Sequence, residues 1–185
     1  MTEELATQEQ PSRKRLWGLL IFAAVAAFIM LLASSLGRAQ QGPVRVGSEA
    51  PQFTLTTFDG ETYNTEDYAG QVIVVNFWAS WCQPCELEAA ELEQAYQMYK
   101  DQGVVFLGVD YTDTEPEARS YLERFGVTYP NGPDLRTAIS QAYRTVGVPE
   151  TYIIGPDGTL AAVMIGPYES LNAIIADIEL ALQEQ

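Results

Sequence analysis

The sequence predicts a three-layer α/β sandwich in which helices cover a mixed β-sheet. Two observations predict it. Apolar runs typical of buried strands alternate with helical segments, in the order β-hairpin, β-α-β, two helices, β-hairpin and α. The composition is that of a globular chain, with 185 residues of which 47% are hydrophobic and 19% charged. This length fits one domain, expected at residues 47–185, plus about 40 further residues.

The first 46 residues are set apart from this domain. Residues 1–15 form a polar tail that ends in three basic residues. Residues 16–36 carry no charge and, as a helix, would span roughly 31 Å, close to the ~30 Å hydrocarbon core of a bilayer. We therefore expect one transmembrane anchor here, followed by a short linker at 37–46. A cleaved signal peptide is the alternative, although the apolar stretch is long for one.

Basic residues predict the orientation of this segment. Arg13, Lys14 and Arg15 precede the apolar stretch and outnumber the two arginines that follow it. The N-terminus is therefore expected in the cytoplasm. An anchor and a signal peptide would both export everything beyond residue 36. The expected location is the cell membrane, as a single-pass protein whose domain lies outside the cytoplasm.

Composition also excludes several functions. The chain has a formal charge of −15, and residues 47–185 hold 22 acidic against 5 basic residues, a charge of −17. Nucleic-acid binding therefore has no electrostatic basis. The chain contains no histidine, which excludes Ser-His-Asp triads, histidine-based zinc sites and histidine-ligated haem. Two cysteines are too few for an iron–sulfur cluster, so we expect no metal and no other cofactor.

The first half of the domain should contain a β-hairpin, a buried strand, a helix and a second buried strand, at residues 53–64, 71–78, 83–100 and 104–109. An Asp59-Gly60 turn joins the strands of the hairpin. The two buried strands are near-continuous apolar runs, which indicates a parallel pair joined by a right-handed crossover.

The second half should contain two helices, a β-hairpin and a closing helix, at residues 115–125, 134–144, 151–165 and 168–182. The first of these helices begins at Thr114-Glu115-Pro116-Glu117, which combines a capping threonine, a glutamate three residues later and a proline in the first turn. Gly155-Pro156-Asp157-Gly158 is the turn of the second hairpin.

The two cysteines lie where the first buried strand ends and its helix begins, in Cys82-Gln83-Pro84-Cys85. A structural disulfide that closes so short a loop would stabilise the fold by only about 2 kcal/mol. A zinc site would need two further ligands, and covalent haem attachment needs a histidine where Glu86 stands. The pattern therefore favours a catalytic dithiol.

Position gives the two sulfurs different roles. Cys82 lies at the helix start, where free backbone N–H groups and the macrodipole lower the pKa of a thiol, so it is the expected nucleophile. Cys85, one turn deeper, is the expected resolving thiol. Trp81 and Pro84 flank Cys82 as expected substrate contacts. Pro84 fits the first helical turn, and the alternative for Trp81 is a place in the core.

Glu88 is unexpected on an apolar helix face. Together with Cys85 and Leu92 it follows the i, i+3, i+4 spacing of the side that should face the core. A carboxylate there should have a raised pKa and could exchange a proton with Cys85, which makes Glu88 a third catalytic candidate. The alternative is a side chain that reaches the surface at the helix start. Glu86 is expected on the solvated face.

Three motifs together resemble a known family. They are GSEAPQF at 47–53, NFWASWCQPC at 76–85 and GVPETY at 147–152. From residue 47 to the end, the sequence resembles the thioredoxin-fold, membrane-anchored thiol–disulfide oxidoreductases of the ResA/TlpA/CcmG group, within the redoxin family. The resemblance implies a thioredoxin-like α/β/α sandwich with an added N-terminal β-hairpin.

The resemblance also implies further site residues. In this family the proline that matches Pro149 is cis and faces the dithiol, and the residue that matches Val148 offers backbone hydrogen bonds to substrate. Glu150, the next residue, resembles the CcmG branch and completes the expected substrate-binding set. Members that resemble ResA carry an active-site glutamate where Glu88 stands. General thioredoxins carry a buried aspartate where this chain has Asn76, so proton handling is expected to fall to Glu88.

The resemblance implies an extracytoplasmic reductase of protein disulfides, such as those of apocytochrome c during cytochrome c maturation. Its electrons would come from a membrane partner of the CcdA/DsbD kind. One alternative is a peroxiredoxin-like peroxidase, since residues 47–71 also resemble the start of those chains, but Ala79 stands where they carry threonine. Another is a non-catalytic membrane-anchored carrier in which two thiolates bind Cu(I).

Overall fold

The computed structural model describes residues 13–39 and 44–183, and the chain divides into two units, residues 1–42 and 43–185. The first unit contains helix α1 (Arg13–Ala39). Within the described ranges, no helix combines the length and the hydropathy that a membrane span needs. The predicted anchor at 16–36 falls in α1. Most of the predicted tail and residues 40–43 of the predicted linker lie outside the described residues.

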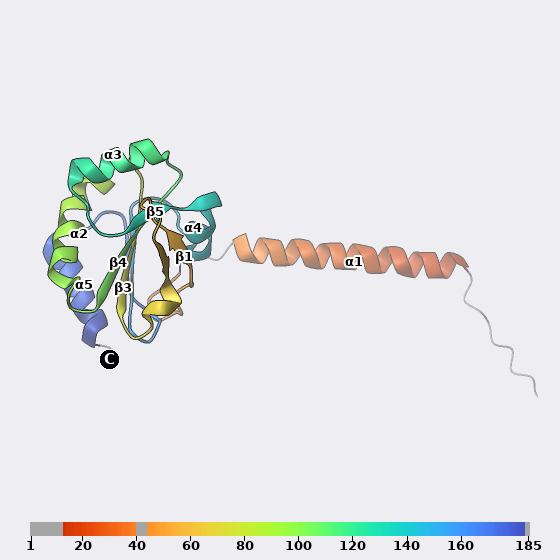
Figure 1. Ribbon diagram of the computed structural model, residues 1–185. Helices are drawn as coiled ribbons and strands as arrows, with labels where there is room; N and C mark the ends of the chain where they lie inside the picture. The colour runs from red at the N-terminus through yellow and green to blue at the C-terminus, as the bar shows by residue number, and fades with distance from the viewer. Residues whose placement is uncertain (1–12, 40–43, 184–185) are drawn as a thin grey trace, which may run out of the picture. The chain divides into compact units, whose positions relative to one another are not determined.

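The second unit is built around a five-stranded mixed sheet (Figure 1) with the strand order β5-β4-β3-β6-β7. Its strands are β3 (Val72–Trp78), β4 (Val104–Asp110), β5 (Asn131–Pro133), β6 (Glu150–Ile154) and β7 (Leu160–Ile165). Strands β3, β4 and β5 run parallel, whereas β6 is antiparallel to both β3 and β7. The predicted mixed sheet is confirmed, and β5 is an edge strand that the sequence analysis missed.

Strand β3 is buried along its whole length, and its side chains alternate between two cores. Val72 and Val74 pack with residues of helices α2 (Cys85–Tyr99) and α5 (Leu171–Gln183) on one face. Ile73, Val75 and Phe77 pack on the other face, with residues of the N-terminal hairpin and of helix α4 (Ala138–Tyr143). Burial of each such side chain contributes about 1.5–3 kcal/mol. Figure 1 shows the resulting layers, with α2 and α5 on one side of the sheet and α4 and β1 on the other.

The N-terminal hairpin is a separate two-stranded sheet of β1 (Thr54–Thr56) and β2 (Thr62–Asn64). The strands pair antiparallel, as predicted. Gly60 supplies the turn with a φ of 87°, a conformation that side chains larger than hydrogen disfavour.

Helix α3 (Glu115–Phe125) begins and ends where its sequence signals predict. The Thr114 hydroxyl donates a hydrogen bond to the Glu117 carboxylate at 2.8 Å. At the other end Gly126 adopts the left-handed conformation with a φ of 65°, and its N–H donates to the carbonyls of the last turn.

One predicted helix is wrong in its first half. The prediction was a helix over 134–144, but α4 begins only at Ala138 because the backbone before it leaves the helical region, with a φ of 54° at Thr137. Asp134 is instead a capping group placed ahead of α4. Its carboxylate accepts a hydrogen bond from the backbone N–H of Ser140 at 2.8 Å.

Candidate active site

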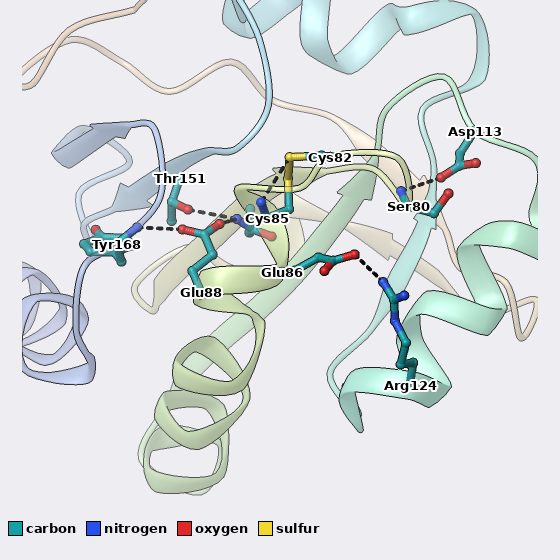
Figure 2. The surroundings of a disulfide bond; sticks show 10 residues. Ser80, Cys82, Cys85, Glu86, Glu88, Asp113, Arg124, Thr151 and Tyr168 are labelled. Carbon is teal, nitrogen blue, oxygen red and sulfur yellow. Dashed lines mark hydrogen bonds and ion pairs between the residues drawn. A yellow bond between two sulfur atoms is a disulfide. The ribbon is translucent and has the colours of Figure 1, made fainter.

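Cys82 and Cys85 form a disulfide immediately after β3, with an S–S distance of 2.00 Å (Figure 2). Cys85 is the first residue of α2, two residues later than the predicted helix start, and Cys82 lies in the turn before it. Both residues are buried, at 3% and 1% exposure. The backbone N–H of Cys85 donates to the Cys82 sulfur at 3.1 Å. After reduction, this N–H would favour a thiolate on Cys82, the predicted nucleophile.

Trp78 at the end of β3 and Trp81 in the turn have opposite environments. Trp81 lies on the surface with 58% exposure, and its indole N–H donates to the backbone oxygen of Thr112 at 3.4 Å. The alternative of a core position for Trp81 is therefore wrong. Trp78 is the core residue, with 2% exposure and an indole N–H that donates to the Asn131 side chain at 2.8 Å. Pro84 is also exposed, directly before α2.

The turn is fixed in place by the loop that follows β4. The backbone N–H of Ser80 donates to the Asp113 carboxylate at 2.6 Å, and the N–H of Tyr111 donates to the carbonyl of Trp78 at 2.7 Å. Figure 2 shows Asp113 reaching the turn from this neighbouring loop. No local sequence signal predicts this contact, because the partners lie 33 positions apart.

Glu88 lies below the disulfide and is buried, at 1% exposure (Figure 2). Its Oε1 accepts a hydrogen bond from the side-chain amide of Asn76 at 2.9 Å, and its Oε2 accepts one from the backbone N–H of Tyr168 at 2.8 Å. Burial raises the pKa of Glu88 from its usual 4.5 to about 7, although both hydrogen bonds lower it. The predicted burial and raised pKa are confirmed, and the surface alternative is wrong.

Asn76 connects Glu88 to the strand that follows the cis-proline. Its amide nitrogen also donates to the Thr151 hydroxyl at 2.9 Å. Asn76 is 4% exposed and Thr151 fully buried. Tyr168 lies just ahead of α5, which begins at Leu171, three residues later than predicted. Its N–H has no intrahelical partner there and donates to Glu88.

The loop at the start of the 147–152 motif packs against the cluster that contains the disulfide. The Val148-Pro149 peptide bond is cis, as the resemblance implies. Val148 is partly buried and packs on the apolar cluster that contains Cys82 and Cys85. The loop and the dithiol therefore form one site.

Glu150 lies beneath this loop rather than on its surface, at 1% exposure. One carboxylate oxygen accepts hydrogen bonds from the backbone N–H groups of Val146 at 2.8 Å and Gly147 at 3.1 Å. The other accepts from the hydroxyl of Tyr152 at 2.6 Å. All of these groups belong to the protein itself, so Glu150 holds the loop in shape and does not present itself as a substrate contact.

Glu86 has a basic partner that lies far from it in the sequence. Arg124 of α3 forms an ion pair with its carboxylate (Figure 2). The expected solvated Glu86 is thus a half-buried member of an interhelical pair. Across the described part of the chain, no group of three or more His, Cys, Asp or Glu side chains could hold a metal ion.

A mixed sheet of this topology, a Cys-x-x-Cys disulfide at a helix start and a cis-proline loop against it define a thiol–disulfide oxidoreductase of thioredoxin fold. The AhpC/TSA family model matches residues 46–163, and the chain belongs to this family.

Individual relatives agree with this class. The chain is 32% identical over 147 residues to the thiol-disulfide oxidoreductase ResA of Geobacillus kaustophilus, which covers 76% of this chain and 84% of the relative. It is 30% identical over 120 residues to ResA of Bacillus subtilis, covering 65% and 67%. Among solved structures, a thioredoxin-family thiol:disulfide interchange protein from Chlorobium tepidum matches 75% of this chain and 98% of its own, with a TM-score of 0.67 and 26% identity.

Proposed function

We propose that this chain reduces disulfides of other proteins outside the cytoplasm. The observation that carries the proposal is the Cys82–Cys85 disulfide with a buried carboxyl group, Glu88, one helical turn away. A dithiol at a helix start supplies the nucleophile. The buried carboxyl group supplies a proton acceptor at the site, so that water is not needed for this role.

The reaction starts from the reduced dithiol. The Cys82 thiolate attacks a substrate disulfide, forms a mixed disulfide and releases one substrate thiolate, which takes up a proton. The Cys85 thiol gives its proton to the Glu88 carboxylate, and the Cys85 thiolate attacks the sulfur of Cys82. This step restores the Cys82–Cys85 bond and releases the second substrate thiolate. The enzyme loses two electrons and the substrate gains two.

The protonation of Glu88 suits this step. With a pKa of about 7, its carboxyl group is ionised in about half of the molecules at neutral pH. An ordinary glutamate would be ionised but would bind the proton too weakly to keep it. Burial therefore gives Glu88 the affinity that a temporary proton acceptor needs.

Exposed apolar side chains lie on the segments that carry the disulfide and the cis-proline loop. Trp81, Leu87 and Val146 are 58%, 69% and 71% exposed and lie in the turn, the first turn of α2 and the cis-proline loop. Such side chains favour an extended, unfolded polypeptide as substrate, with hydrogen bonds to the backbone of Val148. We propose apocytochrome c as this polypeptide and a membrane protein of the CcdA/DsbD kind as electron donor, because the family resemblance implies both.

The proposed location outside the cytoplasm rests on the sequence alone. It is supported by the uncharged stretch at 16–36 and by the three basic residues before it. Alkylation of intact cells, with the dithiol reduced, should label Cys82 with a membrane-impermeant thiol reagent. Labelling only after lysis would contradict this location.

Trapping tests the reaction itself. In full-length protein, Cys85→Ser should accumulate a mixed disulfide with substrate through Cys82, because the resolving thiol is missing. Cys82→Ser, the matched control, should form none. Mass spectrometry identifies the trapped polypeptides. A wild-type chain that reduces no protein disulfide but consumes peroxide would refute the proposal in favour of the peroxidase alternative.

A further inference from the structure

We propose that Asn76 is a positioning residue whose side-chain amide holds the Glu88 carboxylate where it exchanges a proton with Cys85, and that Thr151 holds this amide in turn. The inference rests on the proposed function and adds two residues to its site. Neither residue touches a sulfur or the substrate in the proposed reaction, so each would act through Glu88.

The three residues come from three different elements. Asn76 lies on β3, Glu88 on α2 and Thr151 on β6. Asn76 and Thr151 are directly paired across the two antiparallel strands, so their side chains stand on the same face of the sheet. Both hydrogen bonds of the amide measure 2.9 Å, and all three residues are at most 4% exposed.

Only one orientation of the Asn76 amide satisfies these contacts. An ionised carboxylate accepts hydrogen bonds and cannot donate them, so the nitrogen of Asn76 must face Glu88. The two N–H bonds of that nitrogen supply one donor for Glu88 and one for the Thr151 hydroxyl. The ionised carboxylate, which can only accept, therefore sets which atom of the amide faces it, and Thr151 anchors the nitrogen there by accepting its second N–H.

This contact opposes the effect of burial on Glu88. A hydrogen bond to the charged form of an acid favours that form, so the Asn76 amide lowers the Glu88 pKa while desolvation raises it. The backbone N–H of Tyr168 acts in the same direction on the other oxygen. Without the amide, the carboxyl group would be protonated in most molecules at neutral pH and would seldom be able to accept the proton of Cys85.

Other titratable groups that face Glu88 do not supply this function. The carboxylate of Glu91, on the same helix, raises the pKa of Glu88. The remaining groups are tyrosines whose pKa burial raises above its usual value, and they are neutral at pH 7: Tyr121, Tyr129 and Tyr168. None of these titratable side chains stabilises the ionised carboxylate of Glu88. The side-chain amide of Asn76 does so through its hydrogen bond.

The test replaces Asn76, the hydrogen-bond donor, with an apolar side chain of similar size, so that no cavity is left in the core. In full-length Asn76→Leu, the pKa of Glu88 should rise by about one unit, because a hydrogen bond to a charged group is lost. Its ionised fraction at pH 7 should then fall from about one half to about one tenth. Carbon-13 NMR of labelled glutamate carboxyl groups in the oxidised protein measures this directly, with Glu88→Gln identifying the resonance.

A kinetic readout accompanies the titration. The rate at which Cys85 resolves a preformed mixed disulfide should show a pH midpoint that moves upward in Asn76→Leu by the same amount as the Glu88 pKa. In Glu88→Gln the midpoint should disappear. A purely structural role of Asn76 would change the rate at all pH values equally.

Thr151 provides the matched pair of controls. Thr151→Ser keeps the hydroxyl acceptor and should leave the Glu88 pKa unchanged, whereas Thr151→Val removes the acceptor and should raise it, by less than Asn76→Leu does. The valine variant also carries the test if Asn76→Leu does not fold.

Two results would overturn the inference. One is an unchanged Glu88 pKa in folded Asn76→Leu or, failing that variant, in Thr151→Val. The other is a raised pKa without a shift of the kinetic midpoint. A raised Glu88 pKa in a chain whose wild type reduces no protein disulfide would instead confirm the contact and refute the proposed function.

Discussion

Asp110 is another buried acid, and the proposed reaction does not use it. It is the last residue of β4, lies opposite Trp78 in the sheet and is 2% exposed. Within the described residues its Oδ1 has no hydrogen-bond partner. Burial raises the pKa of Asp110 from its usual 3.8 to about 8, and the nearby Asp113 and Asp134 add to this effect. The folded chain therefore holds Asp110 protonated at neutral pH.

This acid should make folding stability depend on pH. Between about pH 4 and pH 8 the folded chain keeps a proton that the unfolded chain has lost, so stability falls as pH rises, by up to about 1.4 kcal/mol per pH unit. Asp110→Asn removes this titration. Its free energy of unfolding should therefore fall less than that of the wild type as the pH rises from about 4 to about 8. Urea denaturation at several pH values measures the difference.

A surface variant controls for the loss of charge. Asp101→Asn changes an exposed residue and should leave the pH dependence of the wild type in place. If the curves of wild type and Asp110→Asn ran parallel across the whole range, the protonated state of Asp110 would be disproved.

Sequence reasoning reached some site residues and missed others for a physical reason. Helical spacing predicted that Glu88 is buried near Cys85, because both lie on one local element. It could not find the Asn76–Thr151 contact or the Tyr168–Glu88 contact, whose partners lie 75 and 80 positions apart. Such pairs depend on strand register and on the place where a distant helix begins.

At the scale of elements, predictions held where local signals are strong. Helix α3 has a threonine at its N-cap position, a proline in its first turn and a C-terminal glycine, and its bounds agree with the sequence. Strand β5 has only three residues and contains Gly132 and Pro133, so it shows no period that could reveal it. It forms because β4 offers a free edge to pair with.

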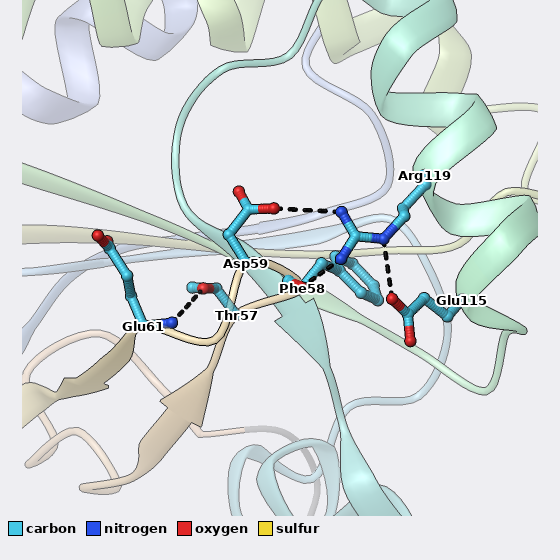
Figure 3. A network of polar contacts seen from close by, with 6 residues as sticks. All are labelled: Thr57, Phe58, Asp59, Glu61, Glu115 and Arg119. Carbon is cyan, nitrogen blue, oxygen red and sulfur yellow. Dashed lines mark hydrogen bonds and ion pairs between the residues drawn. The ribbon is translucent and has the colours of Figure 1, made fainter.

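Arg119 of α3 fixes the added hairpin to the rest of the domain (Figure 3). Its guanidinium donates to the carbonyl oxygen of Phe58 and to the carboxylate of Asp59 at 3.2 Å. It also donates to the Glu115 carboxylate at 2.8 Å and lies over the Phe58 ring at 5.4 Å. One side chain thus joins the hairpin turn to a helix some 60 residues away.

Removal of this contact should loosen the hairpin without unfolding the domain. In Arg119→Ala, the amide protons of Thr57 and Glu61, which bond within the turn, should exchange with solvent faster than in the wild type. Arg119→Lys should give an intermediate rate, because an ammonium cannot reproduce the planar fork of donors. Hydrogen exchange followed by NMR checks both, and equal protection in all three proteins would show that Arg119 does not hold the hairpin.

At the scale of the whole molecule, charge should set the redox potential. Residues 47–185 carry −17, with 22 acidic and 5 basic residues, and negative charge disfavours a thiolate and with it the reduced form. We expect a reduction potential nearer to that of thioredoxin, about −270 mV, than to that of a strongly oxidising periplasmic protein of the same fold, about −120 mV. Equilibration with a dithiol of known potential measures it, and a value near the oxidising end would contradict the argument.

Arg124 adds a positive charge near the dithiol that the neighbouring sequence does not contain. By sequence, no Lys or Arg occurs between Arg45 and Lys100, yet the fold brings Arg124 to Glu86, beside Cys85. Loss of this cation in Arg124→Gln should lower the potential by less than about 20 mV, since solvent reaches the pair and screens its charge. Lys100→Gln, at the far end of α2, makes the same charge change and should have a smaller effect.

The burial of both sulfurs also isolates them kinetically. Cys82 is 3% and Cys85 1% exposed, so a protein that docks against the exposed Trp81 should reach them more readily than a small thiol does. Small thiols have no docking surface, and glutathione, which is negatively charged, is also repelled by so acidic a domain. Exchange with the free thiols of the surroundings should therefore be slow beside exchange with proteins that dock. The dithiol can then keep a redox state out of equilibrium with its medium, and access rather than potential decides which molecules receive its electrons.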